Sequence, residues 1–363
     1  MPLTGPDSAG GIEDRDAAIA GIGLWQAAHG DRIRGHEIVV RAEDDGCTDS
    51  AIARQAAERL VVIGGLAGVL GPDCSAGAQA AAPIFAAHAV VQISGAATET
   101  ELTFQQPAGR FFFRTVYSNE LQGALIGQFV ADGLHPASAW VVDDGEVYGQ
   151  DLAAAAQAAL ERGSVSVRRR SIQRGTVDFS ALAREIAAAK PGFVGFGGFN
   201  PEAALFYRQL RDAGYTGPFG AGDAAASIPN FVLPLGADLA EGVYFAGCPV
   251  ALPGALDAEF RRVHGGAPVA SPFVPQYADA ARVLLDAIDR TAEEQPDGSL
   301  RIDRDKLRDA VRVTAVNDGF SGQVAFDANG DRTSLQGELQ ERARDLAWTA
   351  CQVRGGRFVQ IFP

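Results

Sequence analysis

The sequence predicts an α/β fold with two doubly wound parallel-sheet lobes. Short apolar runs alternate with longer helix-like runs, and this rhythm implies parallel strands joined by crossover helices. The alternation forms two consecutive series of similar size, the second of which begins near Tyr117. Two loops, 71–77 and 94–100, each end a strand-like run and open a helix-like run. Because doubly wound sheets bind ligands beyond the carboxyl ends of their strands, we expect a ligand site at these loops.

The individual elements follow from hydrophobic period and from turn residues. Ile52, Ala56 and Leu60, for example, share one helix face. In the first series we expect helices at 12–29, 51–63 and 77–88 and strands at 37–43, 67–70 and 89–93. In the second we expect helices at 119–132, 149–162, 179–190 and 201–213 and strands at 139–142, 165–172, 193–196 and 218–221. Beyond it we expect helices at 256–264, 277–291 and 306–313, a polar loop at 293–299, and antiparallel strands at 321–326 and 345–353 with a turn at 327–330.

Composition and charge exclude several classes of protein. Of 363 residues, 47% are hydrophobic and 21% are charged, which is an ordinary globular balance. The net charge of −14 opposes binding to nucleic acid or to anionic membranes, and we interpret the basic run 168–170 as a solvated strand edge. No window reaches the roughly 18 apolar residues of a transmembrane helix, and no signal peptide is visible in the sequence as printed. The four cysteines permit two disulfides, which favours an oxidising compartment.

The loops at 71–77 and 94–100 have two open interpretations. Ser75 is placed to cap the helix that follows, and Thr98 with Glu101 matches a Thr-x-x-Glu capping box. Capping alone would explain both. Alternatively, the first N–H groups of both helices lack partners and carry partial positive charge, so the two loops could share one small anion such as a carboxylate or phosphate.

Three further residues stand at strand ends of the second series. Tyr148 and Phe199 each place an aromatic ring beside the start of a helix, and Asp223 closes the strand at 218–221. Aromatic residues in such places usually pack in the core or at its rim, and an acidic residue is usually a helix cap or solvated. An acidic side chain is also what a ligand ammonium would require.

The sequence contains little that could support catalysis. Its five histidines are scattered, and it has no nucleophile elbow, phosphate-binding P-loop or zinc-ribbon spacing. The pairs Asp44-Asp45 and Asp143-Asp144 are strand neighbours whose side chains point to opposite faces. We therefore expect no catalytic residue, no metal and no cofactor, and an enzyme is disfavoured.

Eight short stretches carry a resemblance to a known family. In order they are 2–6, 43–47, 71–75, 94–98, 113–115, 148–149, 197–202 and 322–330. With them the chain resembles, over essentially its whole length, the type I periplasmic solute-binding proteins of ABC importers. Within these it is similar to the branched-chain amino-acid (leucine/isoleucine/valine) binding subgroup. The resemblance implies two lobes, joined by a hinge of crossover segments, that hold a free amino acid between them.

The resemblance also implies which residues bind the ligand. Ser75, Ala96 and Thr98 would hold the carboxylate of the amino acid and share in its ammonium. Asp223 would stand where the family has an acidic ammonium partner, and Tyr148 would close over the ligand from the second lobe. A buried zwitterion needs hydrogen bonds to both of its charges, so an anion site and a carboxylate are required together.

Some positions depart from the family pattern. Phe199 stands where relatives often carry a tyrosine, so a hydroxyl contact to the ligand is lost. Gly10 replaces a larger pocket-lining side chain and leaves more room, and Asp223 is one methylene shorter than glutamate. These changes leave space for a ligand larger than leucine or valine. Relatives also have a central strand before 2–6, whereas here Met1 precedes that segment directly; the strand either lies before the printed sequence or is replaced by another segment.

The family pattern pairs the first two cysteines, Cys47 and Cys74, as a disulfide. Cys248 and Cys351 lie outside that pattern, but both fall in strand-like runs near the expected hinge. We therefore expect a second bridge between them.

These inferences combine into one expectation about organisation and function. We expect one lobe to comprise 1–116 plus 248–326 and the other 117–247 plus 327–363, with the ligand in a cleft between them. The protein would be a periplasmic or extracellular monomer, free or lipid-anchored, that captures a branched-chain, aliphatic or related larger amino acid for the permease subunits of an ABC importer. The alternative is a sensor or binding protein for amides, urea or aromatic acids on the same fold.

Overall fold

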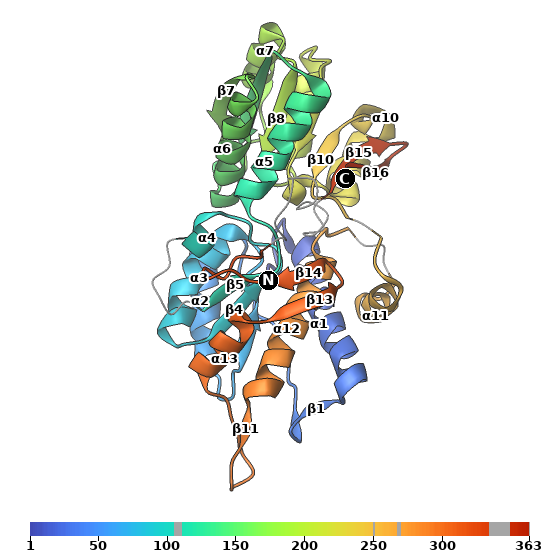
Figure 1. The fold of residues 1–363 in the computed structure, drawn as a ribbon. Coiled ribbons are helices and arrows are strands. Elements are labelled where there is room, and N and C mark those ends of the chain that lie inside the picture. Colours follow the sequence, from blue (N-terminus) through green and yellow to red (C-terminus); the bar gives the residue numbers. More distant parts are fainter. Residues whose placement is uncertain (105–110, 250, 267–269, 334–348, 363) are drawn as a thin grey trace. The chain divides into compact units, whose positions relative to one another are not determined.

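The chain divides into two compact units, shown in Figure 1. The computed structural model describes residues 1–104, 111–249, 251–266, 270–333 and 349–362. Unit 1 comprises Met1–Tyr117, Ala251–Val269 and Phe273–Gln336, and unit 2 comprises Ser118–Val250, Ala270–Pro272 and Gly337–Pro363. No helix within the described ranges is long and apolar enough to cross a membrane.

Unit 1 is built on a parallel sheet in the order β3-β4-β5. These strands are β3 (Gly68–Leu70), β4 (Val91–Ser94) and β5 (Phe112–Arg114). The helices are α1 (Ser8–His29), α2 (Ser50–Val61), α3 (Ser75–Ala87), α4 (Glu101–Phe104), α11 (Gly254–His264), α12 (Val274–Thr291) and α13 (Arg304–Arg312). The hairpins are β1 (Arg32–Ile33) with β2 (His36–Glu37), β11 (Glu293–Glu294) with β12 (Leu300–Arg301), and β13 (Ala315–Gly319) with β14 (Gly322–Ala325).

Helices cover both faces of this sheet. Val91 and Ile93 point to one face and join a buried cluster with residues of α1, α12 and α13. Phe112 lies on the opposite face in a cluster with Ala78 and Ala82 of α3. Side chains alternate between the faces of a strand, so each strand contributes to both layers.

Unit 2 is built on a seven-stranded sheet in the order β16-β15-β10-β9-β8-β6-β7. Its strands are β6 (Ser138–Asp143), β7 (Ser166–Ser171), β8 (Phe193–Gly197), β9 (Phe219–Ala221), β10 (Tyr244–Ala246), β15 (Ala350–Arg354) and β16 (Arg357–Phe362). Its helices and helical turns are α5 (Asn119–Phe129), η1 (Val130–Leu134), α6 (Val147–Arg162), α7 (Ser180–Ala189), α8 (Glu202–Asp212), η2 (Asp223–Ala225), η3 (Ile228–Val232), α9 (Leu233–Leu235) and α10 (Ala237–Ala240).

The sheet of unit 2 is also sandwiched between helices. Strands β10, β9, β8, β6 and β7 are mutually parallel, and β15 is antiparallel to both β10 and β16. Val141 and Phe193 pack on residues of α6 on one face, whereas Trp140 and Phe196 pack on residues of α7 and α8 on the other. The predicted fold class, with two doubly wound parallel sheets, is confirmed.

Residues 37–43 do not form the expected strand. His36–Glu37 pairs with Arg32–Ile33, but Val39 and Val40 are 74% and 48% exposed. The run has the composition of a strand, yet a strand also needs a neighbour to complete its ladder. Among the described residues, no strand pairs with 38–43, and the other edge of β3 is unpaired.

The tail also pairs differently from the expectation. Strand β14, within the expected segment 321–326, pairs with β13, whereas β15 pairs with β10 and β16. Residues 345–348 lie outside the described residues. The ends of the expected loop 293–299 are part of the hairpin β11–β12. For β11 and β14 the partner lies close in sequence, which keeps the entropic cost of closing the loop small.

The unit boundaries differ from the expected lobes around the tail. Residues 327–336 belong to unit 1, and 248–250 and 270–272 belong to unit 2. The segment 327–336 joins unit 1, where Asp331 forms an ion pair with Arg114, at 2.7 Å between Oδ1 and Nε. The neighbouring Arg332 also donates to the backbone carbonyl of Thr115, the residue after β5, at 2.6 Å.

Candidate functional site

The first predicted loop of unit 1 is anchored on several sides. Cys74 forms a disulfide with Cys47, and their Cα atoms are 5.0 Å apart. Tyr277 of α12 donates from its hydroxyl to Asp73 Oδ1 at 2.9 Å. Burial raises the pKa of the Asp73 carboxyl. Gly71 has φ of +115°, a backbone conformation that side-chain-bearing residues rarely adopt. These contacts therefore fix the backbone conformation of the loop that leads into α3.

Ser75 does not act as the cap of α3. It is the first residue of that helix, and the residue before it provides no side-chain cap. The Ser75 hydroxyl instead accepts a hydrogen bond from the Glu99 backbone N–H at 3.2 Å. A hydroxyl that accepts in this way still has its own O–H to donate. The capping interpretation is wrong for Ser75, and the bond joins the two predicted loops directly.

The second loop, 94–100, is tied to the first through Ser94. The Ser94 hydroxyl donates to the Pro72 carbonyl at 2.6 Å and accepts from the Ala97 and Ala96 N–H groups at 3.0 and 3.3 Å. Ala96 itself is 9% exposed. Both loops therefore lie side by side within unit 1.

The expected capping box at Thr98 is absent. The Glu101 N–H donates to Glu99 Oε1 at 2.9 Å, and α4 has only four residues, so it provides little summed dipole for an anion. Thr98 is 1% exposed, and its hydroxyl has no hydrogen-bond partner among the described residues. A buried hydroxyl without a partner costs about 1–3 kcal/mol.

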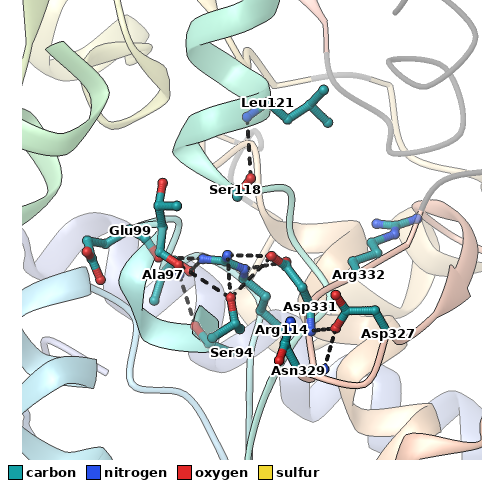
Figure 2. A network of polar contacts seen from close by, with 12 residues as sticks. Ser94, Ala97, Glu99, Arg114, Ser118, Leu121, Asp327, Asn329, Asp331 and Arg332 are labelled. Carbon is teal, nitrogen blue, oxygen red and sulfur yellow. Dashed lines mark hydrogen bonds and ion pairs between the residues drawn. The ribbon is translucent and has the colours of Figure 1, made fainter. Parts of the chain in front are cut away.

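Figure 2 shows how Arg114 fixes this loop. The guanidinium is fully buried and makes two bonds to Asp331, at 2.7 and 2.8 Å. It also donates to the carbonyls of Glu99 and Ala97 at 2.6 and 3.4 Å. Asp331 is held in turn by the turn at Asp327, whose carboxylate accepts from the Asp331 N–H at 2.9 Å. The ion pair thus holds both backbone carbonyls that flank Thr98.

In unit 2 the predicted residues Tyr148 and Asp223 are in direct contact. The Tyr148 hydroxyl, at the start of α6, donates to Asp223 Oδ1 at 2.6 Å. The Ala224 N–H donates to the same oxygen at 2.7 Å. Asp223 and Tyr148 are only 2% and 4% exposed, so Asp223 is not a solvated surface acid. The position before it must be glycine, because a Cβ at Gly222 would overlap the Tyr148 hydroxyl.

Gln122 of α5 completes this cluster and was not predicted from the sequence. Its side-chain amide donates to Asp223 Oδ2. The residue lies among apolar neighbours in a helix-like run, and no motif distinguishes it from a polar residue on the outer face. Only the tertiary contact, between residues 101 positions apart, reveals it.

Phe199 packs between two groups in the loop after β8. The centroid of its ring lies 5.2 Å from that of the Tyr148 ring. The guanidinium carbon of Arg174 lies 4.6 Å from the centroid of the Phe199 ring. The Phe199 N–H donates to Asp144 Oδ2 at 3.0 Å. Burial raises the pKa of Asp144 to about 6, although this bond and Arg174 oppose the rise.

The remaining expectations concern the second bridge, the basic run and Gly10. Cys248 and Cys351 form a disulfide with Cα atoms 6.2 Å apart, within unit 2. The basic run 168–170 lies on the edge strand β7, where Arg169 pairs with Asp143 at 2.9 Å. A Cβ at Gly10 would meet no atom within 4 Å.

The structure therefore assembles the predicted residues into two sets. Ser75, Ala96 and Thr98 form the hydroxyl set of unit 1, and Tyr148, Phe199 and Asp223 form the carboxylate set of unit 2. The first set presents hydroxyl donors, and the second presents a buried carboxylate beside an aromatic wall.

Comparisons with known proteins identify the family of this chain. A family model described as "Periplasmic binding protein" matches residues 1–341. The leucine-, isoleucine-, valine-, threonine-, and alanine-binding protein of Pseudomonas aeruginosa is 26% identical over 361 residues, spanning 96% of this chain and 90% of that protein.

Solved structures share the fold. The crystal structure of a leucine binding protein from Thermotoga maritima matches with a TM-score of 0.81 at 24% identity, covering 99% of this chain and 95% of that chain. A benzoate complex of a solute binding protein from R. palustris matches with a TM-score of 0.76 at 18% identity, covering 99% and 93%. The resemblance found in the sequence is confirmed, and the chain belongs to the periplasmic binding protein family.

Proposed function

We propose that this protein captures an amino acid outside the cytoplasm and delivers it to the permease subunits of an ABC importer. The observation that carries the proposal is the buried Thr98 hydroxyl, which has no partner among the described residues. Thr98 stands in a loop that is bonded to Ser75, and we expect both hydroxyls to bind one anion. The Pseudomonas aeruginosa relative, named for binding five aliphatic or small amino acids, supports an amino acid as the ligand.

The two sets of residues would bind opposite ends of the ligand. The hydroxyls of Ser75 and Thr98, with N–H groups at the start of α3, would donate to the carboxylate, while Asp223 would accept from the ammonium. Hydrogen bonds to ionised groups are roughly twice as strong as neutral ones, and burial strengthens them further. Closure of the two units around the ligand would exclude water and signal the loaded state to the permease.

The ligand side chain is proposed to be aliphatic, branched or somewhat larger. Phe199 offers an apolar ring without a hydroxyl, backed by Tyr148 and Arg174. The open space beside Gly10 supports room for a bulkier side chain. Nothing in this arrangement supplies a reacting group, so we propose binding without turnover, by a periplasmic or extracellular monomer.

A second candidate is a carboxylic acid without an ammonium, as in the benzoate-bound structure. Such a ligand would use only the hydroxyl set of unit 1. The observation that disfavours it is Asp223, a buried carboxylate that would face an uncharged part of the ligand and gain nothing from it.

A thermal-shift screen tests the proposal. The panel contains the aliphatic amino acids, their amides, urea and small aromatic acids. A ligand at about 100 times its Kd stabilises the protein by about 2.7 kcal/mol. We expect the largest shift with leucine, isoleucine, valine or a larger aliphatic amino acid. A flat response to every amino acid, or a shift with benzoate alone, would refute the proposal.

A further inference from the structure

We propose that Gln122 is a positioning residue that fixes the Asp223 carboxylate for a ligand ammonium. This inference rests on the proposed function and deepens it, because it names a residue through which unit 2 would select ligands that carry an amino group. Gln122 is fully buried in α5, and its side-chain amide donates to Asp223 Oδ2.

Both oxygens of Asp223 are held by separate donors. Oδ1 accepts from the Tyr148 hydroxyl and from the Ala224 N–H, at 2.6 and 2.7 Å, and Oδ2 accepts from Gln122. A carboxylate held at one oxygen can still rotate about its Cβ–Cγ bond. Held at both oxygens, it presents its remaining lone pairs in one direction. Gln122 supplies the second restraint.

The Gln122 amide turns its NH₂ group toward Asp223 Oδ2. This orientation suits an ionised carboxylate, which accepts hydrogen bonds only. Its carbonyl oxygen then points elsewhere, and it has no partner among the described residues. A methionine or leucine would fill a similar volume without this cost. The glutamine is therefore better explained by its bond to Asp223 than by packing.

The helix that carries Gln122 is held rigidly against α6, which carries Tyr148. Asn119, at the start of α5, donates to the Tyr148 carbonyl at 3.3 Å and to Asp151 at 3.0 Å. A Cβ at Gly123 would overlap Ala155 of α6, so the helices approach as closely as glycine allows. A positioning group is effective when it is mounted on rigid elements in this way.

Two substitutions separate a positioning role from a packing role. Gln122→Met keeps the volume and removes the donor. Gln122→Glu keeps the shape but replaces the donor with a carboxyl, which donates to Asp223 only when it is protonated. The titratable groups facing that carboxyl are Asp223 and Tyr148, with Asp151 reached through Asn119. The nearby negative charge of Asp223 raises the pKa of an introduced carboxyl.

Affinity for leucine, or for the amino acid that gives the largest thermal shift, is measured by calorimetry at about pH 5.5 and about pH 8. We expect Gln122→Met to weaken binding about tenfold at both pH values. We expect Gln122→Glu to weaken it about 100-fold at the higher pH and to recover about tenfold at the lower pH, because the protonated carboxyl can donate again. Gln157→Glu on α6, where the side chain makes an exposed contact with Glu161, adds the same charge and is expected to bind like the wild type.

The outcomes distinguish this inference from the proposed function. If the wild type binds an amino acid and both Gln122 variants bind equally well at both pH values, the inference fails and the proposed function stands. If the losses are equal at the two pH values for Gln122→Glu, the role is packing and the inference also fails. If the wild type binds no amino acid, the proposed function fails and takes the inference with it.

Discussion

The two proposed sets of binding residues differ in how far hydrogen bonds within their own unit satisfy them. In unit 2, the Asp223 carboxylate is held by Tyr148, Gln122 and a backbone N–H, so it is organised by bonds internal to that unit. In unit 1, the loop around Thr98 is fixed by Arg114, yet the Thr98 hydroxyl itself has no partner among the described residues. Both oxygens of the Asp223 carboxylate therefore have donors within unit 2, whereas the Thr98 hydroxyl of unit 1 has an unmet hydrogen bond among the described residues.

The largest expected effect follows from removing the charge of Asp223. Asp223→Asn keeps the shape of the side chain but loses the ionic attraction to a ligand ammonium. We expect amino-acid affinity to fall about 100-fold, because breaking a buried charged pair costs about 2–5 kcal/mol. Calorimetric titration measures the loss, and Asp238→Asn on the exposed surface of unit 2 is the matched control. A loss below about threefold would contradict the role given to Asp223.

The organisation of unit 2 also predicts a dependence of stability on pH. The pKa of folded Asp144 is raised to about 6, chiefly by burial, from 3.8. Its neutral form is favoured in the folded state, so its contribution to stability is full below pH 3.8 and is lost as the pH rises through about 6. The expected loss between about pH 4 and about pH 7 is about 2 kcal/mol.

Chemical denaturation of the wild type and of Asp144→Asn at these pH values isolates this contribution, since the other titrating groups are common to both proteins. As the pH rises, we expect the unfolding free energy of the wild type to fall relative to that of Asp144→Asn. An unchanged difference would show that Asp144 keeps its ordinary pKa.

The unmet hydrogen bond of unit 1 predicts opposite effects on binding and stability. Thr98→Val removes the hydroxyl and keeps the volume. We expect affinity to fall about tenfold, while the ligand-free protein is unchanged or more stable by up to about 1 kcal/mol. Thr103 is equally buried, but its hydroxyl accepts from Arg114 at 3.0 Å, so Thr103→Val should destabilise the ligand-free protein. A destabilised Thr98→Val variant would mean that the Thr98 hydroxyl is already satisfied.

The smallest expected effect concerns Gly10 on α1. A side chain there meets no atom within 4 Å, so Gly10→Leu should fold and gain about 0.5–1 kcal/mol from the higher helix propensity. If this space accommodates the ligand side chain, the variant should lose several-fold more affinity for the larger amino acids than for valine. Thermal shifts across the panel measure both effects. An equal loss of affinity for all amino acids would show that the space beside Gly10 does not hold the ligand side chain.

Much of the fold could be predicted from local pattern, and so could the strand ends at which the proposed site residues lie. Period and turn residues predicted nearly every strand and helix of the two sheets, and strand ends identified Ser75, Tyr148 and Asp223. What failed depended on distant partners. The run at 37–43 has strand composition but no ladder. Residues 327–336 join unit 1, where Asp331 pairs with Arg114, 217 positions away in the sequence.

The site shows the same limit. Thr98 and Glu101 match the motif of a capping box, in which the Thr98 hydroxyl would accept from the Glu101 N–H. In the structure the Glu99 side chain accepts from that N–H instead. Gln122 carries no local signal, because a single glutamine in an apolar helix could face either solvent or core. Its function becomes visible only when the chain brings Asp223 to it.

One calorimetric comparison tests the central claim that a zwitterion is recognised at both ends. Leucine is titrated beside 4-methylpentanoate, which lacks the ammonium, and 3-methylbutylamine, which lacks the carboxylate. The account predicts that leucine binds and that each truncated analogue binds at least about 100-fold more weakly, because each leaves one buried set of polar groups unmatched. Binding of 4-methylpentanoate as tightly as leucine would contradict it.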